Sequence, residues 1–283
     1  MGAKTHVAES ATAAPAEALA PLVRRYIGYR YEGFSPGTHL GLPSRHLTIV
    51  ITLGAPLRLA APGLHRHAAA DFSTLVGGLH TRPAIIMHDG NQYGVQLELT
   101  PAGARSLFGT PAGELAAAVV GLDDLLGPKA YELAERMASA PTWPLRFAVL
   151  NEVLAGRTDR LGAYDRTLAH AWDRVVASGG AARVADVAAE VGWSRRHLSE
   201  RFAREYGLTV KEAARVVRFE RSKRLLQCGG RPTLADVAVA CGYYDQAHLA
   251  REWNDLAGCP PSAWLAAEEL PFVQGAATGQ GAR

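Results

Sequence analysis

The sequence predicts an α+β protein of 283 residues, in which an N-terminal antiparallel β domain precedes an all-α domain. Two observations carry this prediction. Apolar and polar residues alternate within residues 26–100, as in Leu47–Leu53 and Val95–Leu99, which is the period of a half-buried strand. After Thr100 the apolar period becomes helical, and two helical segments about 50 residues apart repeat the same pattern.

The composition is typical of a folded globular protein and excludes wholesale disorder or a collagen-like chain, with 48% hydrophobic and 20% charged residues. The three cysteines lie far apart and form no CxxC pair, which excludes a disulfide framework or zinc ribbon and suits a reducing cytoplasm. The longest apolar stretches are too short to span a bilayer. We expect residues 1–21 to form a loose tail rather than a signal peptide, and residues 268–283 to form a disordered tail.

The strands of the β domain are short and evenly spaced, which predicts a small antiparallel barrel or sandwich. Asp89-Gly90-Asn91 is predicted to be the turn of a hairpin between 85–87 and 93–99. Helices are predicted further along the chain, ending at glycines and prolines, over residues 111–126, 129–140, 144–155 and 165–177. These patterns divide the chain into a regulatory domain over residues 22–160 and a helical domain over residues 161–267.

The repeat is the strongest signal in the chain. Ala185-Asp186-Val187-Ala188 recurs as Ala235-Asp236-Val237-Ala238, and Gly192 recurs as Gly242. From there the distance between matching residues grows from 50 to 51 positions. His197-Leu198 then matches His248-Leu249, Phe202 matches Trp253, and Gly207 matches Gly258. Two copies of one supersecondary unit are therefore predicted, with one residue inserted in the second copy.

Each copy has the spacing of a helix-turn-helix motif. A small Ala allows close helix approach, a Gly takes the turn, and a Leu packs the second helix on the first, as in Ala188, Gly192 and Leu198. One such match is often accidental, and a helical bundle with an incidental repeat is the alternative. Two matches in register favour a pair of DNA-binding units.

The second helix of each unit has a face suited to a DNA groove. In the first unit Ser194 is the predicted N-cap. The side of the helix that packs on the protein carries Leu198, Arg201, Phe202 and Glu205. The opposite side carries Arg196, Ser199, Glu200 and Ala203. Arg196 is suited to a guanine edge and Glu200 to cytosine. In the second unit Arg251 is the one strong base reader, while Ala247 and Ala250 are suited only to thymine methyl groups.

A long helix is predicted between the two units. Thr209-Val210-Lys211-Glu212 forms a capping box, and the helix continues to about Cys228. It contains Arg215, Arg218, Arg221, Lys223 and Arg224. A helix of this length spans about 28 Å. That is close to the ~34 Å of one DNA turn, so both recognition helices would meet one face of a duplex.

Residues 183–264 resemble the DNA-binding domain of AraC/XylS-type transcription regulators. The resemblance lies in Gly192–Leu198, Arg218–Leu226, Gly242–Leu249 and Gly258–Trp264. It implies two helix-turn-helix units that bind consecutive major grooves. The predicted DNA-contacting residues are Arg195, Arg196, Ser199, Glu200, Arg204, Arg218, Arg221, Gln246, Ala247, Ala250 and Arg251. Two residues depart from the family pattern: Tyr244 replaces the usual capping Ser and Val210 replaces a frequent Pro, so we expect a looser second recognition helix unless Asp245 caps it.

The N-terminal domain resembles the regulatory domain of actinobacterial members of that family. The resemblance lies in Ser44–Thr48, Val76–Pro83 and Leu99–Ala104. It implies a cupin-like barrel with flanking helices that binds a small-molecule effector, pairs two subunits, or does both.

Six histidines lie in this domain, and His65-Arg66-His67 followed by Asp71 is similar to a metal-cupin ligand run. The flanking Pro62-Gly63 and Ala68–Ala70 favour solvent-exposed loop histidines instead, so we predict no metal site and no cofactor. Arg45, His46, His80 and Arg82 are the candidates for an anionic effector site. No nucleophile-base-orienter triad, GxGxxG loop or P-loop is present in the sequence.

These patterns together predict a cytoplasmic, sequence-specific transcription regulator rather than an enzyme. Its expected partners are double-stranded DNA, RNA polymerase, a small-molecule effector and a second copy of the chain, with dimerisation through the helices of 129–155. One alternative is a metal-dependent cupin enzyme with a helical appendage. Another is a protein-interaction adaptor that shows no salt-dependent binding to any duplex.

The net charge of +3 conceals an uneven distribution. Residues 193–224 hold ten Lys and Arg against four Asp and Glu, for +6, whereas residues 225–283 carry −3. The first half of the helical domain is therefore expected to anchor the protein on DNA electrostatically. The second half is expected to adjust specificity or to face the transcription machinery.

Overall fold

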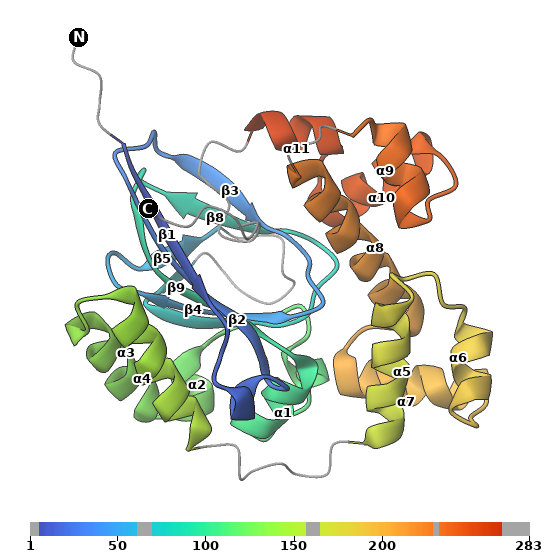
Figure 1. Ribbon diagram of the computed structural model, residues 1–283, viewed down its shortest axis with the longest axis horizontal. Coiled ribbons are helices and arrows are strands. Elements are labelled where there is room, and N and C mark those ends of the chain that lie inside the picture. The colour runs from blue at the N-terminus through green and yellow to red at the C-terminus, as the bar shows by residue number, and fades with distance from the viewer. Residues whose placement is uncertain (1–5, 61–69, 157–164, 229–231, 268–283) are drawn as a thin grey trace.

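The computed structural model describes residues 6–60, 70–156, 165–228 and 232–267. It contains an antiparallel β domain flanked by helices, followed by a domain of helices alone (Figure 1). The predicted α+β class is confirmed. No helix within the described ranges has both the length and the apolar character needed to cross a membrane.

The larger sheet has six strands in the order β1-β2-β9-β4-β7-β10. Every neighbouring pair in it is antiparallel. The strands are β1 Val7–Ala13, β2 Val23–Glu32, β4 Leu47–Thr52, β7 Thr74–Gly77, β9 Gln92–Leu99 and β10 Val119–Gly121. The alternation predicted for β4 and β9 is confirmed, because Leu47, Ile49 and Ile51 are buried, as are Val95, Leu97 and Leu99.

The smaller sheet has four antiparallel strands in the order β3-β8-β5-β6. They are β3 Gly37–Gly41, β5 Leu57–Leu59, β6 Ala70–Phe72 and β8 Ala84–His88. The two sheets pack together where Val50 and Leu75 of the larger sheet meet Leu57, Leu59 and Ile86 of the smaller one. The opposite face of the larger sheet is covered by helices, through Tyr26, Leu47 and Leu97 among others.

Four α-helices and two 3₁₀ helices complete the first domain. They are η1 Glu17–Leu19, α1 Pro101–Phe108, η2 Ala112–Leu115, α2 Leu122–Leu126, α3 Lys129–Ser139 and α4 Trp143–Ala155. Helix α1 begins after Thr100, whose side chain accepts a hydrogen bond from the Gly103 amide, and Pro101 occupies its first position. The predicted helices at 129–140 and 144–155 are confirmed within one residue at each end.

Three local predictions for this domain are wrong. Residues 7–13 of the expected N-terminal tail form an edge strand paired to β2 from Val7↔Glu32 to Ala13↔Tyr26, and Leu19 is fully buried. The Ala-rich sequence gives little apolar periodicity, so only the pairing with β2 reveals this strand. Residues 1–5 and 268–283 lie outside the described residues.

The segment 111–126, predicted as one helix, is instead η2, β10 and α2. Its centre pairs with β7, from Val119↔Gly77 to Gly121↔Leu75, so sheet hydrogen bonds replace the helical ones. The turn at 89–91 exists, with Gly90 at φ +98°, but it does not form a hairpin. It carries the chain from β8 in the smaller sheet to β9 in the larger one, since neither strand pairs with the other.

The second domain contains α5 Arg166–Ala177, α6 Val184–Glu190, α7 Arg195–Tyr206, α8 Val210–Gln227, α9 Leu234–Cys241, α10 Gln246–Ala257 and α11 Pro261–Ala267. The two domains share apolar contacts. Leu42, from the loop after β3, is buried in one cluster with Val216, Phe219 and Trp253 of the helical domain. The β domain therefore supplies part of the apolar packing around the second helix-turn-helix unit.

Half-buried histidines of the β domain predict that the protein becomes less stable as the pH falls. Burial lowers the pKa of His39 and of His80 to about 4, and burial also lowers the pKa of His46. An unfolded histidine titrates near 6.5, so between about pH 6.5 and 4 the unfolded chain binds protons that the folded chain does not. The free energy of unfolding is therefore highest above this window, where these histidines are neutral in both states, and it decreases as the pH falls through the window.

We expect the thermal unfolding midpoint to be lower at pH 5 than at pH 7.5, and His39→Asn to reduce that difference. The control is His170→Asn, because the His170 side chain is 57% exposed and pairs with Glu190 at the surface. An equal pH effect in the His39 and His170 variants would contradict this prediction.

Candidate nucleic-acid interface

The first helix-turn-helix unit consists of α6 and α7. Gly192 takes the turn at φ +70°, a left-handed conformation that favours glycine. Ala188 and Leu198 are buried where the two helices meet. The Ser194 hydroxyl accepts a hydrogen bond from the His197 amide, so the predicted N-cap of α7 is present.

The outer face of α7 carries the predicted groove-facing side chains. Arg196 is 89% exposed and Glu200 61% exposed, and their side chains are joined by an ion pair of 2.8 Å. Ser199 and Ala203 are half-buried, and Arg195 and Arg204 are exposed. Arg196 and Glu200 are therefore accessible to a partner at the first turns of the helix, since an exposed ion pair of this kind is weak.

The packed face of α7 differs from the prediction at one residue. Leu198, Phe202 and Glu205 are buried as expected. Arg201 is 48% exposed and donates to Asp165, the N-cap residue of α5, so its predicted packing inside is wrong. Its length lets the guanidinium reach the surface from a position that the helical wheel assigns to the core side.

The end of α7 is docked on the β domain. Arg105 of α1 donates to both carboxylate oxygens of Glu205, over 2.9 and 2.5 Å. Next to this pair, Gly207, the C-cap residue of α7, packs directly against η2 and the residue after it. A Cβ added to Gly207 would lie 2.1 Å from the Cβ of Ala116 and 3.1 Å from the Cα of Gly113. The first turns of α7 stay exposed while its last turn is buried against η2.

The second unit consists of α9 and α10. Thr233 and Asp236 form a capping box at the start of α9, and Gly242 takes the turn at φ +76°. The Asp245 carboxylate accepts a hydrogen bond of 2.6 Å from the His248 amide, so Asp245 caps α10. Of the two possibilities left open by the sequence, the structure shows the second, because Asp245 supplies the capping oxygen in place of residue 244.

The outer face of α10 is poorer in hydrogen-bonding groups than that of α7. Gln246, Ala247 and Arg251 are exposed, and Ala250 is half-buried. Among the described residues, Arg251 forms no ion pair, which leaves it available to a partner. The sequence predicted that all four of these residues face a DNA groove.

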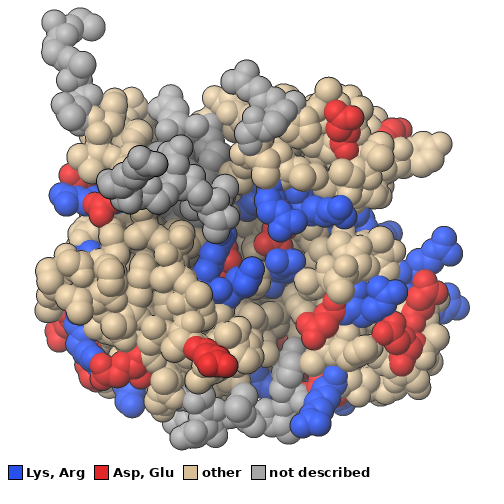
Figure 2. Space-filling model, viewed as in Figure 1, with Lys and Arg blue, Asp and Glu red and all other residues tan. Residues whose placement is uncertain are grey.

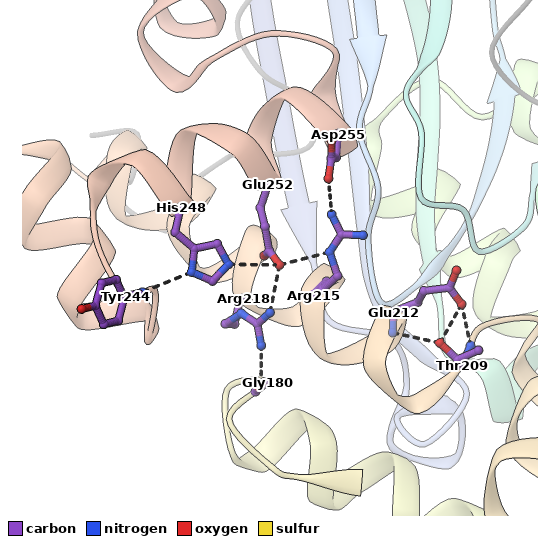
Figure 3. Close-up of polar contacts among 9 residues, drawn as sticks. All are labelled: Gly180, Thr209, Glu212, Arg215, Arg218, Tyr244, His248, Glu252 and Asp255. Atoms are coloured by element: carbon purple, nitrogen blue, oxygen red, sulfur yellow. Dashed lines mark hydrogen bonds and ion pairs between the residues drawn. The ribbon is translucent and has the colours of Figure 1, made fainter. Parts of the chain in front are cut away.

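A buried carboxylate links α8 to α10 (Figure 3). Glu252 is 8% exposed, and its Oε1 lies 3.0 Å from Arg215 Nε, 3.1 Å from Arg218 Nη2 and 3.7 Å from His248 Nε2. Arg218 also donates to the Gly180 carbonyl oxygen, in the loop between α5 and α6, over 2.7 Å. The sequence prediction placed Arg218 on DNA, whereas its side chain is 17% exposed and joins three segments of the protein.

The end of α8 lines a cavity of about 710 Å³ between the two domains. Lys and Arg side chains gather in the groove between the β domain and the helices (Figure 2). The cavity is lined by basic residues from both domains, namely Arg24, Arg25, Arg45, His46, Arg221, Lys223 and Arg224. Arg221, predicted to contact DNA, therefore faces this cavity.

The wall on the side of the β domain consists of the polar residues that alternate with the buried ones in β4 and β9, including Thr48, Gln96 and Glu98. Arg25 donates to Glu98 over 2.6 Å, and Arg45 lies 3.4 Å from Glu220 of α8. Burial lowers the pKa of His46, while Glu220 and Glu98 raise it and Arg45 and Arg25 lower it. Most of this wall was not predicted, although a Gln and a Glu within an apolar strand, Gln96 and Glu98, are a signal for it.

The four effector-site candidates do not lie together. Arg45 and His46 line the cavity, whereas the His80 imidazole contacts the carbonyl oxygen of Arg82. Arg82 lines a separate, open cleft beside Arg215 and Asp255. His65 and His67 lie outside the described residues, and the described residues contain no group of three or more His, Cys, Asp or Glu able to hold a metal ion.

Comparisons with known proteins match both domains. Residues 161–267 match a family model described as a helix-turn-helix domain, and residues 11–121 match one described as a domain of unknown function. The chain is 34% identical over 64 residues to the uncharacterized HTH-type transcriptional regulator YbfI of Bacillus subtilis (strain 168). That match spans 23% of this chain and 22% of the relative's length.

The fold is similar to that of ToxT from Vibrio cholerae. One ToxT structure covers 85% of this chain and 98% of its own, with a TM-score of 0.52 at 13% identity. A structure of wild-type ToxT bound to an unsaturated fatty acid has a TM-score of 0.53 at 12% identity and covers 85% and 94%. Residues 161–267 therefore belong to a helix-turn-helix family, and the fold of the chain as a whole is similar to that of ToxT.

Proposed function

We propose that this regulator binds double-stranded DNA sequence-specifically by inserting α7 and α10 into consecutive major grooves. The observation that supports this most is the pair of helix-turn-helix units whose recognition helices expose their first turns on either side of the 18-residue helix α8. A helix of that length spans about 27 Å, close to the spacing of two successive grooves.

The two recognition helices are proposed to contribute differently. Arg196 and Glu200 form a charged pair on α7, suited to a guanine and a cytosine edge, while α10 offers Gln246, Ala247, Ala250 and Arg251. Arg195 and Arg204 are exposed beside the first set and are proposed to contact phosphates. The basic segment 193–224 makes the first unit the electrostatic anchor.

The test compares three arginine variants of the full chain on DNA chosen from a random pool by the wild-type protein. Arg196→Ala is expected to lose about 1–3 kcal/mol of binding free energy and to relax the base preference at one position. Arg251→Ala is expected to lose less at equal salt. The control is Arg201→Ala on the same helix, which removes only the surface pair with Asp165.

A uniform loss across all DNA sequences in Arg196→Ala would make Arg196 a phosphate contact instead. A larger loss in Arg251→Ala would contradict the proposed division of labour. If the wild-type chain selects no DNA and shows no salt-dependent binding to any duplex, the adaptor alternative is favoured over DNA recognition.

The cavity between the domains is proposed to hold an anionic effector. Solved ToxT structures carry an unsaturated fatty acid or a substituted butenoic acid, both of them carboxylic acids. In this chain basic residues line the cavity from both domains, with Arg24, Arg25 and Arg45 on the β domain and Arg221, Lys223 and Arg224 on α8. The acidic residues of the lining are Glu98 and Glu220, so positive charge is in excess. The apolar side chains of the lining, Val176, Ala177, Val217 and Cys228, are small and fewer than the basic ones, so a compact acid with several charges suits the cavity better than a long acyl chain.

Citrate and oleate are suitable probes of this proposal. We expect citrate to raise the unfolding midpoint of the wild-type chain, and Arg45→Ala combined with Arg224→Ala to abolish that shift, because both walls lose a cation. The matched control is Arg30→Ala, an exposed arginine of β2 paired with Glu32 away from the cavity. Binding of oleate without citrate would contradict the proposed ligand class.

We infer further that the regulator acts as a homodimer in the cytoplasm and contacts RNA polymerase at promoters. The outer faces of α3 and α4 expose Tyr131 and Leu145, by 61% and 51%, which supports pairing through these helices. The match of residues 161–267 to a helix-turn-helix family model favours a regulator over the metal-dependent enzyme alternative. The proposed domain limits are residues 22–160 and 161–267, with β1 added to the first domain.

A further inference from the structure

The second helix-turn-helix unit has one more residue in its turn than the first. Six positions separate Gly192 from Leu198, but seven separate Gly242 from Leu249. The aromatic residue after each glycine packs edge-on against a histidine of the recognition helix, Trp193 on His197 at 4.7 Å and Tyr243 on His248 at 5.4 Å. Since Ser194 and Asp245 are the equivalent N-caps, the additional residue is Tyr244.

The Tyr244 side chain has no structural role within the described part of the chain. It is 92% exposed, more than any other large hydrophobic residue described. Its backbone is nonetheless fixed, because the Tyr244 amide donates to His248 Nδ1 over 3.2 Å and His248 Nε2 lies 3.7 Å from the buried Glu252 (Figure 3). The turn is therefore anchored in a way that presents the ring to solvent directly before the N-cap of α10.

Two positions that are polar on the outer face of α7 are apolar on the outer face of α10. The positions of Arg196 and Ser199 in the first unit are occupied by Ala247 and Ala250 in the second. Alanines form no hydrogen bonds to base edges, but they pack on the C5-methyl group of thymine. A further apolar group at the same helix end extends that surface, because the N-terminal residues of a recognition helix are the ones that meet base edges.

We propose that Tyr244 is a specificity-determining residue that packs its ring on thymine methyl groups at the edge of the groove entered by α10. This inference rests on the proposed DNA binding and assigns the second unit a preference for thymine-rich sites. A phosphate contact by the Tyr244 hydroxyl is the competing use of the same side chain. A contact with RNA polymerase is less favoured, because the ring adjoins the DNA-reading end of α10.

The experiment uses the full chain and the DNA that the wild-type protein selects from a random pool. Affinities of wild-type, Tyr244→Phe and Tyr244→Ser proteins are measured on this DNA and on a copy with deoxyuridine replacing thymine in the second half-site, which removes only methyl groups. We expect Tyr244→Ser to bind thymine DNA about fourfold more weakly for each methyl group that the ring covers in the wild type, and Tyr244→Phe to bind as the wild type does. On uracil DNA the wild type and Tyr244→Ser are expected to converge.

Val239→Ser is the matched control, because Val239 is the other strongly exposed apolar residue of this unit, at 78%, and lies on α9. Equal losses in Tyr244→Phe and Tyr244→Ser would overturn the methyl contact in favour of the hydroxyl. Unchanged binding by Tyr244→Ser would overturn the inference while leaving the proposed function standing, and reduced promoter activity in that case would point to a protein contact. If the wild type selects no DNA, the proposed function fails first.

Discussion

Replacing Glu252 with alanine is expected to lower the free energy of unfolding by about 3–5 kcal/mol, the usual result of leaving buried charges without their partner. Glu252 is 8% exposed and pairs with Arg215 and Arg218, which are themselves only 25% and 17% exposed. Without the carboxylate, two guanidinium groups face each other in a poorly solvated site. Denaturant unfolding of the full chain measures the change.

Asp255→Ala is the matched control for this prediction. Asp255 pairs with the same Arg215 over 2.6 Å, but it is 65% exposed, so its removal is expected to change stability by no more than about 1 kcal/mol. Similar losses in the two variants would mean that burial of the Glu252 carboxylate is not what makes its ion pairs important.

The same network leads to an expectation for DNA binding. Glu252 lies next to Arg251 on α10, and Arg218 connects it to Gly180. The network therefore sets how α10 sits relative to α8 and to the loop between α5 and α6. Glu252→Gln keeps the shape of the side chain and removes its charge. We expect it to weaken contacts with the second half-site more than contacts with the first.

Gly207→Ala is expected to destabilise the protein by about 2–5 kcal/mol or to separate α7 from η2. Gly207 has φ +70°, which disfavours any side chain, and its new Cβ would lie 2.1 Å from the Cβ of Ala116. Unfolding measurements give the total effect. Hydrogen exchange of residues 112–115 shows whether η2 comes away from the recognition helix.

Gly258→Ala separates the backbone contribution from the close approach. Gly258 ends α10 as Gly207 ends α7, with φ +74°, but its nearest neighbour to a new Cβ is Pro83 Cγ at an ordinary 3.8 Å. We expect a loss of about 1–2 kcal/mol, from the left-handed backbone alone. Equal effects of the two substitutions would show that the β domain does not constrain α7 at this point.

The helix-turn-helix units were predictable because their determinants are local. Ser194 and Thr209 cap the helices that follow them within three residues, and Gly192 and Gly242 adopt the turns that their spacing requires. The α10 start is an instructive exception: the family pattern pointed to residue 244, and the capping oxygen belongs to Asp245. One inserted residue was enough to shift the cap while leaving the rest of the repeat in register.

The antiparallel class of the β domain was predictable from the sequence, but the pairing of its strands was not. Alternation identified β4 and β9, since each strand carries its own period, but the partner of a strand depends on segments far away in the chain. The expected hairpin at 89–91 joins two different sheets, and the helix expected over 111–126 gives way to β10 because β7 supplies a pairing edge. Sequence periodicity predicts neither feature, because it describes each segment separately and not its partner in the sheet.

Local features of the sequence were enough to predict two helix-turn-helix units in register and an antiparallel β domain, because capping, turn formation and strand alternation act over a few residues. The basic charge of the first helix-turn-helix unit and of α8 was also evident from composition. Which of the charged residues are available to a partner, in contrast, depends on the folded structure. It placed Arg218 in a buried network with Glu252 and turned Arg221 toward the cavity between the domains. Those assignments depend on contacts between segments far apart in the chain, whose desolvation and pairing exist only once the chain has folded.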